Sequence, residues 1–303
     1  MSDLPTRVLG RTGLAVSVLG YGTGSSDLRR VPPDVLESVM VSAVDAGVNL
    51  IDTAPDYVLA EEVIGRYLSP HRSRLVLATK CGCVEGPGPS IDKLPQHDYS
   101  PAHIRRGLEE SLRRMRTDHV DVLQVHISPA RTELEACGSV EEMIHLRDSG
   151  LVRFLGMSGT LPNIVDHIAM GVFDTFQIPY SALERDHEGV ISDAAGAGAG
   201  VIVRGGVARG APVVSEERLT RLPELMSRPL GESKSRWESR GLDDLLDGQT
   251  RMEMILRFTL SHPDVHTTIV GTTRVEHLEA NLAAARRGPL SPEVYEEIKR
   301  RLD

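Results

Sequence analysis

The sequence has few cysteines and no surplus of basic residues. Its 303 residues include only Cys81, Cys83 and Cys137, an odd number without the spacing of a disulfide framework. Cys81 and Cys83 are closer together than zinc ligand pairs usually are, and no second pair accompanies them, so we expect no metal site. The 34 Lys and Arg residues are scattered and outnumbered by 43 Asp and Glu residues. This distribution argues against a nucleic-acid partner.

Long hydrophobic runs are also missing. The longest stretch without Asp, Glu, Lys or Arg is Thr12–Ser26, 15 residues rich in Gly, Ser and Thr, which is too short and too polar to span a bilayer. The first residues, MSDLPTRVLGRTG, contain no apolar segment of a secretory signal. Hydrophobic residues still make up 40% of the chain, as in ordinary globular proteins. We therefore expect a cytoplasmic protein with no membrane partner.

Short apolar runs alternate with longer amphipathic segments along the chain. Most runs are rich in Val, Ile and Leu and are bounded by Gly, Pro or polar residues, which is typical of parallel strands buried on both faces. The eight runs are Val16–Tyr21, Asn49–Ala54, Leu75–Lys80, Val120–His126, Val152–Ser158, Thr175–Tyr180, Val201–Arg204 and Thr267–Val270. An open doubly wound sheet usually begins with a Gly-rich G-x-G-x-x-G turn, which is absent here. The pattern predicts a single (β/α)8 TIM barrel over residues 1–303.

Several intervals between these runs have helical patterns. Pro33–Ala46 places apolar residues at helical spacing and is followed by Gly47, a typical helix-terminating residue. Further helices are expected from Pro101, over Ser139–Ser149, Gly248–Ser261 and Arg274–Arg287, and from Pro292.

Three other segments complete the expected architecture. Arg7–Leu9 and Leu14–Ser17 flank a Gly-containing turn and predict a β-hairpin that covers the N-terminal end of the barrel. Long loops are expected at about residues 82–99 and 208–247, at the opposite end, where barrel enzymes bind substrate. The second loop contains the helix-capable Glu216–Leu225 and the only tryptophan, Trp237.

Four side chains capable of proton transfer or ion pairing follow the ends of neighbouring predicted strands. Asp52 and Tyr57 follow the second strand, Lys80 ends the third, and His126 ends the fourth. Each has an ordinary structural explanation: a helix cap, a half-buried ring, a solvated charge and a hydrogen-bonded core histidine. Because a barrel gathers its strand ends around one pocket, function explains the set better than stability does.

The chemistry of these four side chains is coherent. An ammonium group beside a phenol favours the phenolate, so Lys80 should lower the pKa of Tyr57. Asp52 would keep Lys80 charged, and Tyr57 would then be a proton donor near neutral pH. His126 can hydrogen-bond a carbonyl oxygen. The set contains no nucleophile and no metal, so it is suited to protonating an oxygen while a hydride cofactor supplies the electron pair.

With these residues in place, the sequence resembles the aldo-keto reductase superfamily, as a bacterial-type member, along nearly its whole length. The matching segments are Leu9-Gly-Arg-Thr-Gly-Leu14, Leu19-Gly-Tyr-Gly-Thr23, Gly47-Val-Asn-Leu-Ile-Asp-Thr-Ala54, Leu77-Ala-Thr-Lys80, Asp121-Val-Leu-Gln-Val-His126, Leu155-Gly-Met-Ser158, Gln177-Ile-Pro-Tyr180 and Ile269-Val-Gly271 leading to Asn281. Any one segment is weak evidence, but their order and spacing together are specific.

The resemblance implies an NAD(P)H-dependent reductase of aldehydes or ketones that also runs in reverse on alcohols. It implies a catalytic tetrad of Asp52, Tyr57, Lys80 and His126, with Tyr57 and His126 touching the substrate, and an extended cofactor bound without a Rossmann domain. The further cofactor-binding residues that it implies are Gly22, Thr23, Ser158, Gln177, Arg204, Gly271, Thr272, Arg274, His277 and Asn281. Among these, Ser158 and Gln177 would hold the nicotinamide carboxamide.

Two positions depart from the family pattern. An Asn often follows the serine of the fifth strand, but Gly159 stands here and removes one amide partner. An aromatic ring commonly stacks on the nicotinamide from the seventh strand, where this chain has Arg204. A guanidinium can stack on a planar ring. It could instead hold an anionic substrate group or the cofactor pyrophosphate, or face solvent as an ordinary charge at a strand end.

The segment from Gly271 to Asn281 would bind the adenosine end of the cofactor by the same resemblance. Relatives that prefer NADPH usually offer basic residues here to the 2′-phosphate. Gly271 and His277 stand at positions that are often Lys or Arg, and Arg274 supplies the permanent charge. We expect NADPH, held by Arg274 and His277, with NADH as the alternative.

Two other functions fit the same fold. One is a redox-sensing regulatory protein that binds the cofactor tightly and turns over slowly, and the other is a metal-dependent hydrolase, for which the His and acidic clusters are missing. Arg204 and Trp237 are candidate contacts for a small carbonyl substrate. The sequence specifies neither that substrate nor the oligomeric state.

Overall fold

The computed structural model describes residues 4–24, 28–84, 96–221 and 224–303. Parallel strands form a closed barrel in the order β10-β3-β4-β5-β6-β7-β8-β9, and the pairing of β10 with β3 closes it. The barrel strands are β3 (Leu19–Gly22), β4 (Leu50–Asp52), β5 (Val76–Cys81), β6 (Val120–His126), β7 (Val152–Ser158), β8 (Thr175–Pro179), β9 (Gly200–Arg204) and β10 (Thr267–Val270). The predicted TIM barrel is therefore confirmed.

The predicted strands coincide with the observed ones except at the first. The run Val16–Tyr21 is divided between β2 (Ala15–Ser17), which belongs to the hairpin, and the barrel strand β3. Its continuous hydrophobicity arises because both halves are buried, one under the barrel and one within it. Hydrophobicity alone therefore could not separate a strand that covers the barrel from a strand that forms it.

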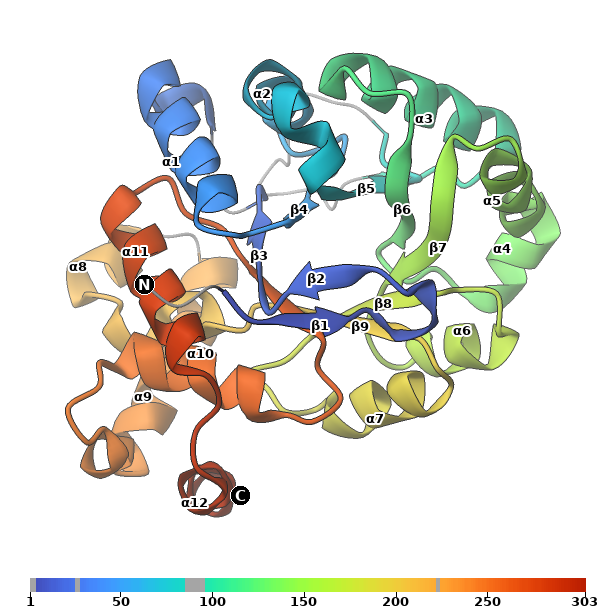
Figure 1. The fold of residues 1–303 in the computed structure, drawn as a ribbon. Coiled ribbons are helices and arrows are strands. Elements are labelled where there is room, and N and C mark those ends of the chain that lie inside the picture. The colour runs from blue at the N-terminus through green and yellow to red at the C-terminus, as the bar shows by residue number, and fades with distance from the viewer. Residues whose placement is uncertain (1–3, 25–27, 85–95, 222–223) are drawn as a thin grey trace.

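Helices surround the barrel as an outer ring (Figure 1). Helices α1, α3 and α12 each begin at the predicted proline, whose fixed φ and missing N–H suit the first helical turn. The helices are α1 (Pro33–Asp45), α2 (Ala60–Tyr67), α3 (Pro101–Met115), α4 (Arg131–Cys137), α5 (Ser139–Asp148), α6 (Ile164–Met170), α7 (Glu188–Gly196), α8 (Glu216–Arg221), α9 (Glu224–Ser239), α10 (Arg251–Ser261), α11 (Val275–Arg287) and α12 (Pro292–Leu302). Short 3-10 turns precede or join some of them, including η3 (Ser69–Arg74), η4 (Ala208–Val213) and η5 (Leu242–Leu245).

The N-terminal hairpin lies across one end of the barrel, as predicted (Figure 1). Strand β1 (Thr6–Val8) pairs antiparallel with β2. Leu9 and Val16 are fully buried in a cluster with Leu50, Val76 and Ile202 from barrel strands. Burying a side chain of this kind contributes about 1.5–3 kcal/mol. The hairpin therefore closes this end as part of the hydrophobic core.

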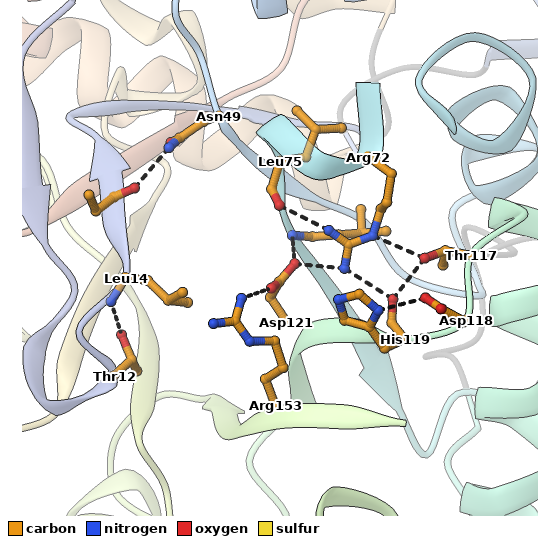
Figure 2. A network of polar contacts seen from close by, with 12 residues as sticks. Thr12, Leu14, Asn49, Arg72, Leu75, Thr117, Asp118, His119, Asp121 and Arg153 are labelled. Atoms are coloured by element: carbon orange, nitrogen blue, oxygen red, sulfur yellow. Dashed lines mark hydrogen bonds and ion pairs between the residues drawn. The ribbon is translucent and has the colours of Figure 1, made fainter. Parts of the chain in front are cut away.

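A buried carboxylate joins three barrel strands near the same end (Figure 2). The side chain of Asp121 on β6 is 1% exposed and accepts a 2.8 Å hydrogen bond from the backbone N–H of Leu77 on β5. It pairs with Arg72 at 2.9 Å and with Arg153 of β7 at 2.6 Å. Arg72 also donates to the carbonyl oxygens of Leu75 and His119. Both carboxylate oxygens therefore have partners, which compensates the buried charge and links β5, β6 and β7 at the closed end of the barrel.

The connection between β9 and α10 is long, as expected for residues 208–247, and most of it is helical. It contains η4, α8, α9 and η5, and the expected helix at Glu216–Leu225 is present as α8, which ends at Arg221. The loop predicted at 82–99 is described only at 82–84 and 96–99. In the described part of the chain, no helix combines the length and apolarity needed to cross a bilayer.

Candidate functional site

Parallel strands bring the predicted site residues to one end of the barrel, opposite the hairpin. Asp52, His126, Ser158 and Arg204 are each the last residue of their strand. The register places His126 beside Ser158, and Ser158 beside Gln177 of the next strand. The strand ends therefore form a continuous rim, which is where barrel enzymes carry out their chemistry.

A buried ion pair lies at the centre of this rim. Lys80 on β5 places its Nζ 2.8 Å from Oδ2 of Asp52, and the Lys80 side chain is 0% exposed. The same ammonium donates a 2.8 Å hydrogen bond to the carbonyl oxygen of Thr53. Burial alone would lower the pKa of Lys80, but the charges of Asp52 and Tyr57 outweigh it and raise that pKa above the ordinary value. Lys80 is therefore a fixed cation.

The second oxygen of Asp52 connects the ion pair to two amide side chains. Asp52 Oδ1 accepts hydrogen bonds from Gln124 at 3.0 Å and from Gln177 at 2.7 Å. Gln177 in turn accepts a 3.0 Å hydrogen bond from the hydroxyl of Ser158. The sequence analysis did not identify Gln124, although a glutamine between apolar residues of a buried strand was the available signal. The predicted catalytic and nicotinamide-binding residues therefore belong to one hydrogen-bond network.

Tyr57 lies against this ion pair. The Lys80 Nζ is 4.9 Å from the centroid of the Tyr57 ring. Burial raises the pKa of the phenol, Lys80 opposes that shift, and the nearby carboxylates Asp52 and Asp56 add to it, so the pKa is raised overall. The expectation of a lowered pKa is therefore wrong for this state of the protein, because the cost of burying a phenolate exceeds the attraction of Lys80.

Gly24 provides the space for the Tyr57 ring. A Cβ atom at position 24 would lie 2.6 Å from Cε2 and 2.7 Å from Cζ of Tyr57. Real Cβ contacts of this kind are essentially never that short, so a larger residue would displace the ring. Gly24 is a positioning residue that was not recognised in the sequence, because its role depends on a contact across the barrel mouth.

His126 is held at the mouth beside Tyr57, with the two ring centroids 6.2 Å apart. Its Nδ1 atom lies 3.1 Å from Cys83 Sγ and 3.5 Å from His97 Nε2. Burial, together with the positive charge of Lys80 and the influence of His97 and Arg204, lowers the pKa of His126 to about 2. The imidazole is therefore neutral over the physiological range, with one ring nitrogen as a hydrogen-bond donor and the other as an acceptor.

The two departures from the family pattern have structural explanations. A Cβ at Gly159 would lie 2.7 Å from the hydroxyl oxygen of Ser128, so the loop after β6 occupies the space that an Asn at 159 would need. Arg204 is partly buried, and burial lowers its pKa. Its charge acts on Tyr57, Asp52 and His126. Arg204 therefore faces the barrel mouth instead of being an ordinary solvated charge.

The residues assigned to the far end of the cofactor lie around the ends of β3 and β10. Gly22, Thr23 and Thr272 line one small cavity. Arg274 occupies the N-cap position of α11 and is exposed. Its side chain accepts no hydrogen bond from the first turn of the helix. His277 is also exposed and follows in the first turn of α11. Gly271 and Asn281 are partly buried, the first just after β10 and the second within α11.

Trp237 does not belong to this site, and the expectation that it contacts substrate is wrong. Its side chain on α9 is fully buried. The indole Nε1 donates a 2.8 Å hydrogen bond to Asp243, which also binds Arg251. Trp237 therefore anchors α9 to the elements that follow it, and the hydrophobicity that suggested a substrate contact serves packing.

The chain matches known proteins over nearly its whole length. Residues 18–303 match the pattern of the Aldo/keto reductase family. The chain is 26% identical over 294 residues to the uncharacterized oxidoreductase YqkF of Bacillus subtilis, covering 95% of this chain and 93% of that protein. It is 27% identical to L-galactose dehydrogenase of Arabidopsis thaliana, covering 94% and 89%.

A solved structure gives the same result for the fold. The holo form of aldo-keto reductase AKR11C1 from Bacillus halodurans superimposes with a TM-score of 0.82 at 26% identity, covering 99% of this chain and 96% of that chain. The family resemblance noted in the sequence is confirmed by these matches. The chain is an oxidoreductase that belongs to the aldo/keto reductase family.

Proposed function

We propose that this protein reduces an aldehyde or ketone to an alcohol with NADPH, and catalyses the reverse reaction on an alcohol. The observation that carries this proposal is the buried Lys80–Asp52 pair at 2.8 Å beneath the Tyr57 ring. Burying a lysine and a carboxylate is costly even when they are paired, and such buried titratable pairs cluster at functional sites. Their position beside the Tyr57 phenol gives them a use in proton transfer.

The residues present fit a nicotinamide dinucleotide. Ser158 and Gln177 offer a hydroxyl and an amide at the rim, linked at 3.0 Å. No side chain caps the N-terminus of α11, and such a helix end attracts a phosphate group. Arg274 and His277, both exposed in the first turn, would add charge and a hydrogen bond for a 2′-phosphate. When bound, the reduced nicotinamide would supply the hydride.

The protein's own residues would manage the proton. The raised pKa of Tyr57 keeps its hydroxyl protonated at neutral pH, so it can donate a proton to the carbonyl oxygen. Lys80 stabilises the phenolate that this transfer leaves, and Asp52 keeps Lys80 charged and in place. Neutral His126 would hydrogen-bond the same oxygen and orient the carbonyl.

The test is a Tyr57→Phe variant, assayed by nicotinamide absorbance on a panel of aldehydes and ketones with NADPH and NADH. We expect turnover to fall by at least about 10²-fold, the usual contribution of a positioned general acid, while NADPH binding, measured by fluorescence, changes little. Tyr67→Phe is the matched control, because Tyr67 lies on α2 against Arg66. Parental turnover in Tyr57→Phe would refute the assigned donor.

The same assay distinguishes the proposed reductase from a regulatory protein that binds the cofactor and turns over slowly. A protein that oxidises one equivalent of bound NADPH and then stops, on every carbonyl tested, would be a cofactor-binding sensor with slow turnover. Multiple turnovers on any carbonyl would support the reductase.

A further inference from the structure

Three potential metal ligands converge beside the proposed catalytic site. They are Cys83 Sγ, His97 Nε2 and His126 Nδ1, all within 4.8 Å of one another. His126 Nδ1 is 3.1 Å from Cys83 Sγ and 3.5 Å from His97 Nε2. In a tetrahedral zinc site, bond lengths of about 2.3 Å to sulfur and 2.0–2.1 Å to nitrogen place such ligand atoms about 3.3–3.6 Å apart. The separation of the two ring nitrogens lies within this range, and that of His126 Nδ1 from Cys83 Sγ is somewhat shorter.

Backbone pairing holds the cluster in this arrangement. Cys83 and His97 face each other across an isolated antiparallel bridge. Hydrogen bonds on both sides support the bridge, from Val84 N to Gln96 O at 3.1 Å and from Asp98 N to Gly82 O at 2.8 Å. The ligand geometry is therefore built by the fold and does not depend on flexible side chains alone.

A carboxylate lies within reach as a fourth ligand. Asp56 Oδ2 is 3.8 Å from His126 Nδ1. The other oxygen, Asp56 Oδ1, is buried and has no hydrogen-bond partner among the described residues. A buried carboxylate oxygen without a partner is costly, and a bound cation would remove that cost.

Hydrogen bonds within the protein account for part of this arrangement, because Cys83 also hydrogen-bonds the side chain of Asp56. A single thiol–imidazole hydrogen bond would explain the contact of Cys83 with His126. However, Nδ1 of His126 has three neighbours, the Cys83 sulfur, the His97 nitrogen and the Asp56 oxygen, and one ring nitrogen forms only one hydrogen bond. A cation among these atoms would satisfy all of them at once.

We propose that Cys83, His97 and His126 form a binding site for a zinc-class divalent cation, with Asp56 completing the coordination. Thiolate and imidazole ligands select Zn²⁺ and similar borderline-soft ions over Mg²⁺ or Ca²⁺. The bound ion takes Nδ1 of His126 into its coordination shell and adds positive charge beside the residue proposed to orient the carbonyl. Zinc therefore inhibits the reductase, a consequence that rests on the function proposed above.

The binding step is tested by titrating the metal-free full-length protein with Co²⁺, without cofactor or substrate. Wild type is expected to develop thiolate-to-cobalt charge transfer and the intense visible bands of tetrahedral Co²⁺ with one equivalent, and excess Zn²⁺ should abolish them. Cys83→Ala and His97→Asn should weaken binding by at least about 10-fold, as loss of a ligand contact does. Cys137→Ser and His145→Asn are the matched controls.

The outcomes decide between binding and no binding. Cobalt spectra without charge transfer, or spectra unchanged in both Cys83→Ala and folded His97→Asn, would overturn the site. Circular dichroism of both variants checks folding, and His97→Asn keeps the test valid if Cys83→Ala fails to fold.

The inhibitory consequence is tested separately with a carbonyl substrate. Added Zn²⁺ should inhibit wild type, EDTA should restore activity, and His97→Asn should require at least about 10-fold more Zn²⁺ for the same inhibition. Equal inhibition of wild type and His97→Asn would contradict inhibition through this site. Because the cobalt titration needs no turnover, a failed reductase assay leaves the binding result interpretable.

Discussion

Replacing Asp52 with Asn tests whether the buried ion pair organises the site. The substitution keeps the size of the side chain but leaves the Lys80 ammonium, which is 0% exposed, without its carboxylate at 2.8 Å. It also brings an amide N–H₂ into a place where three groups already donate, Lys80, Gln124 and Gln177. Removing one partner of a buried pair costs about 3–5 kcal/mol. We expect the free energy of unfolding of Asp52→Asn to fall by that amount.

Urea denaturation followed by circular dichroism measures this loss. The matched control is Asp45→Asn, which removes a carboxylate 3.4 Å from Arg74 where both side chains are more than half exposed, and such a pair contributes at most about 1 kcal/mol. The double variant Asp52→Asn/Lys80→Met has no isolated charge. Its loss should therefore be smaller than the sum of the two single losses by at least about 1 kcal/mol.

The same variant should lose activity. Without Asp52, burial is no longer offset by a carboxylate, so the pKa of Lys80 should fall and the phenolate of Tyr57 should lose its counter-charge. A loss of stability under about 1 kcal/mol in Asp52→Asn, or additive losses in the double variant, would refute the reasoning that the pair is buried and coupled.

Three further predictions concern the mouth and the cofactor. Gly24→Ala should lower kcat/KM by on the order of 10²-fold by displacing the Tyr57 ring. The control Gly107→Ala, where a Cβ meets nothing within 4 Å, should leave steady-state kinetics unchanged. Equal kinetics in both variants would contradict the role of the Gly24–Tyr57 contact. Arg274→Ala should raise the KM for NADPH roughly 10-fold relative to that for NADH, as expected for the loss of one charged hydrogen bond. Arg287→Ala, at the other end of α11, should leave this ratio unchanged. An unchanged ratio in Arg274→Ala would exclude Arg274 from the phosphate site. With EDTA present, the pH profile of kcat/KM for reduction should show no inflection near pH 6.5, because the pKa of His126 is lowered to about 2. The rate should fall only at alkaline pH, where Tyr57, whose pKa is raised, loses its proton. An acid limb near pH 6.5 that disappears in His126→Asn would show that His126 titrates there.

The fold could be predicted from the sequence because the barrel strands are local and strongly hydrophobic. The predicted limits of the fourth, fifth and eighth runs match β6, β7 and β10. The conformation of segment 208–247 was harder to predict, because its many charged residues resemble those of a loop although most of it is helical. Trp237 shows the difficulty well, since its burial depends on Asp243 and on the packing of the whole segment.

The positions of the catalytic candidates could also be predicted, but their electrostatics could not. The predicted strand ends were enough to identify Asp52, Lys80 and His126, but they do not show how deeply each side chain is buried. The sign of the Tyr57 shift depends on how fully the phenol is buried relative to its distance from Lys80, and neither quantity is encoded by spacing. The proximity of Cys83, His97 and His126 could not be predicted for a related reason, because these residues come from different strands and loops.

Asp52 connects the two halves of the proposed reaction. One of its oxygens fixes the ammonium next to Tyr57, the proposed proton donor, and the other binds Gln177, which is bonded to Ser158. Groups that position the donor and groups assigned to the nicotinamide therefore share one carboxylate. A shift of either group must move the other, since a buried and fully hydrogen-bonded carboxylate has no alternative partners to adopt. This coupling explains why Asp52 should matter to proton transfer, cofactor position and stability together, although it touches none of the reacting atoms.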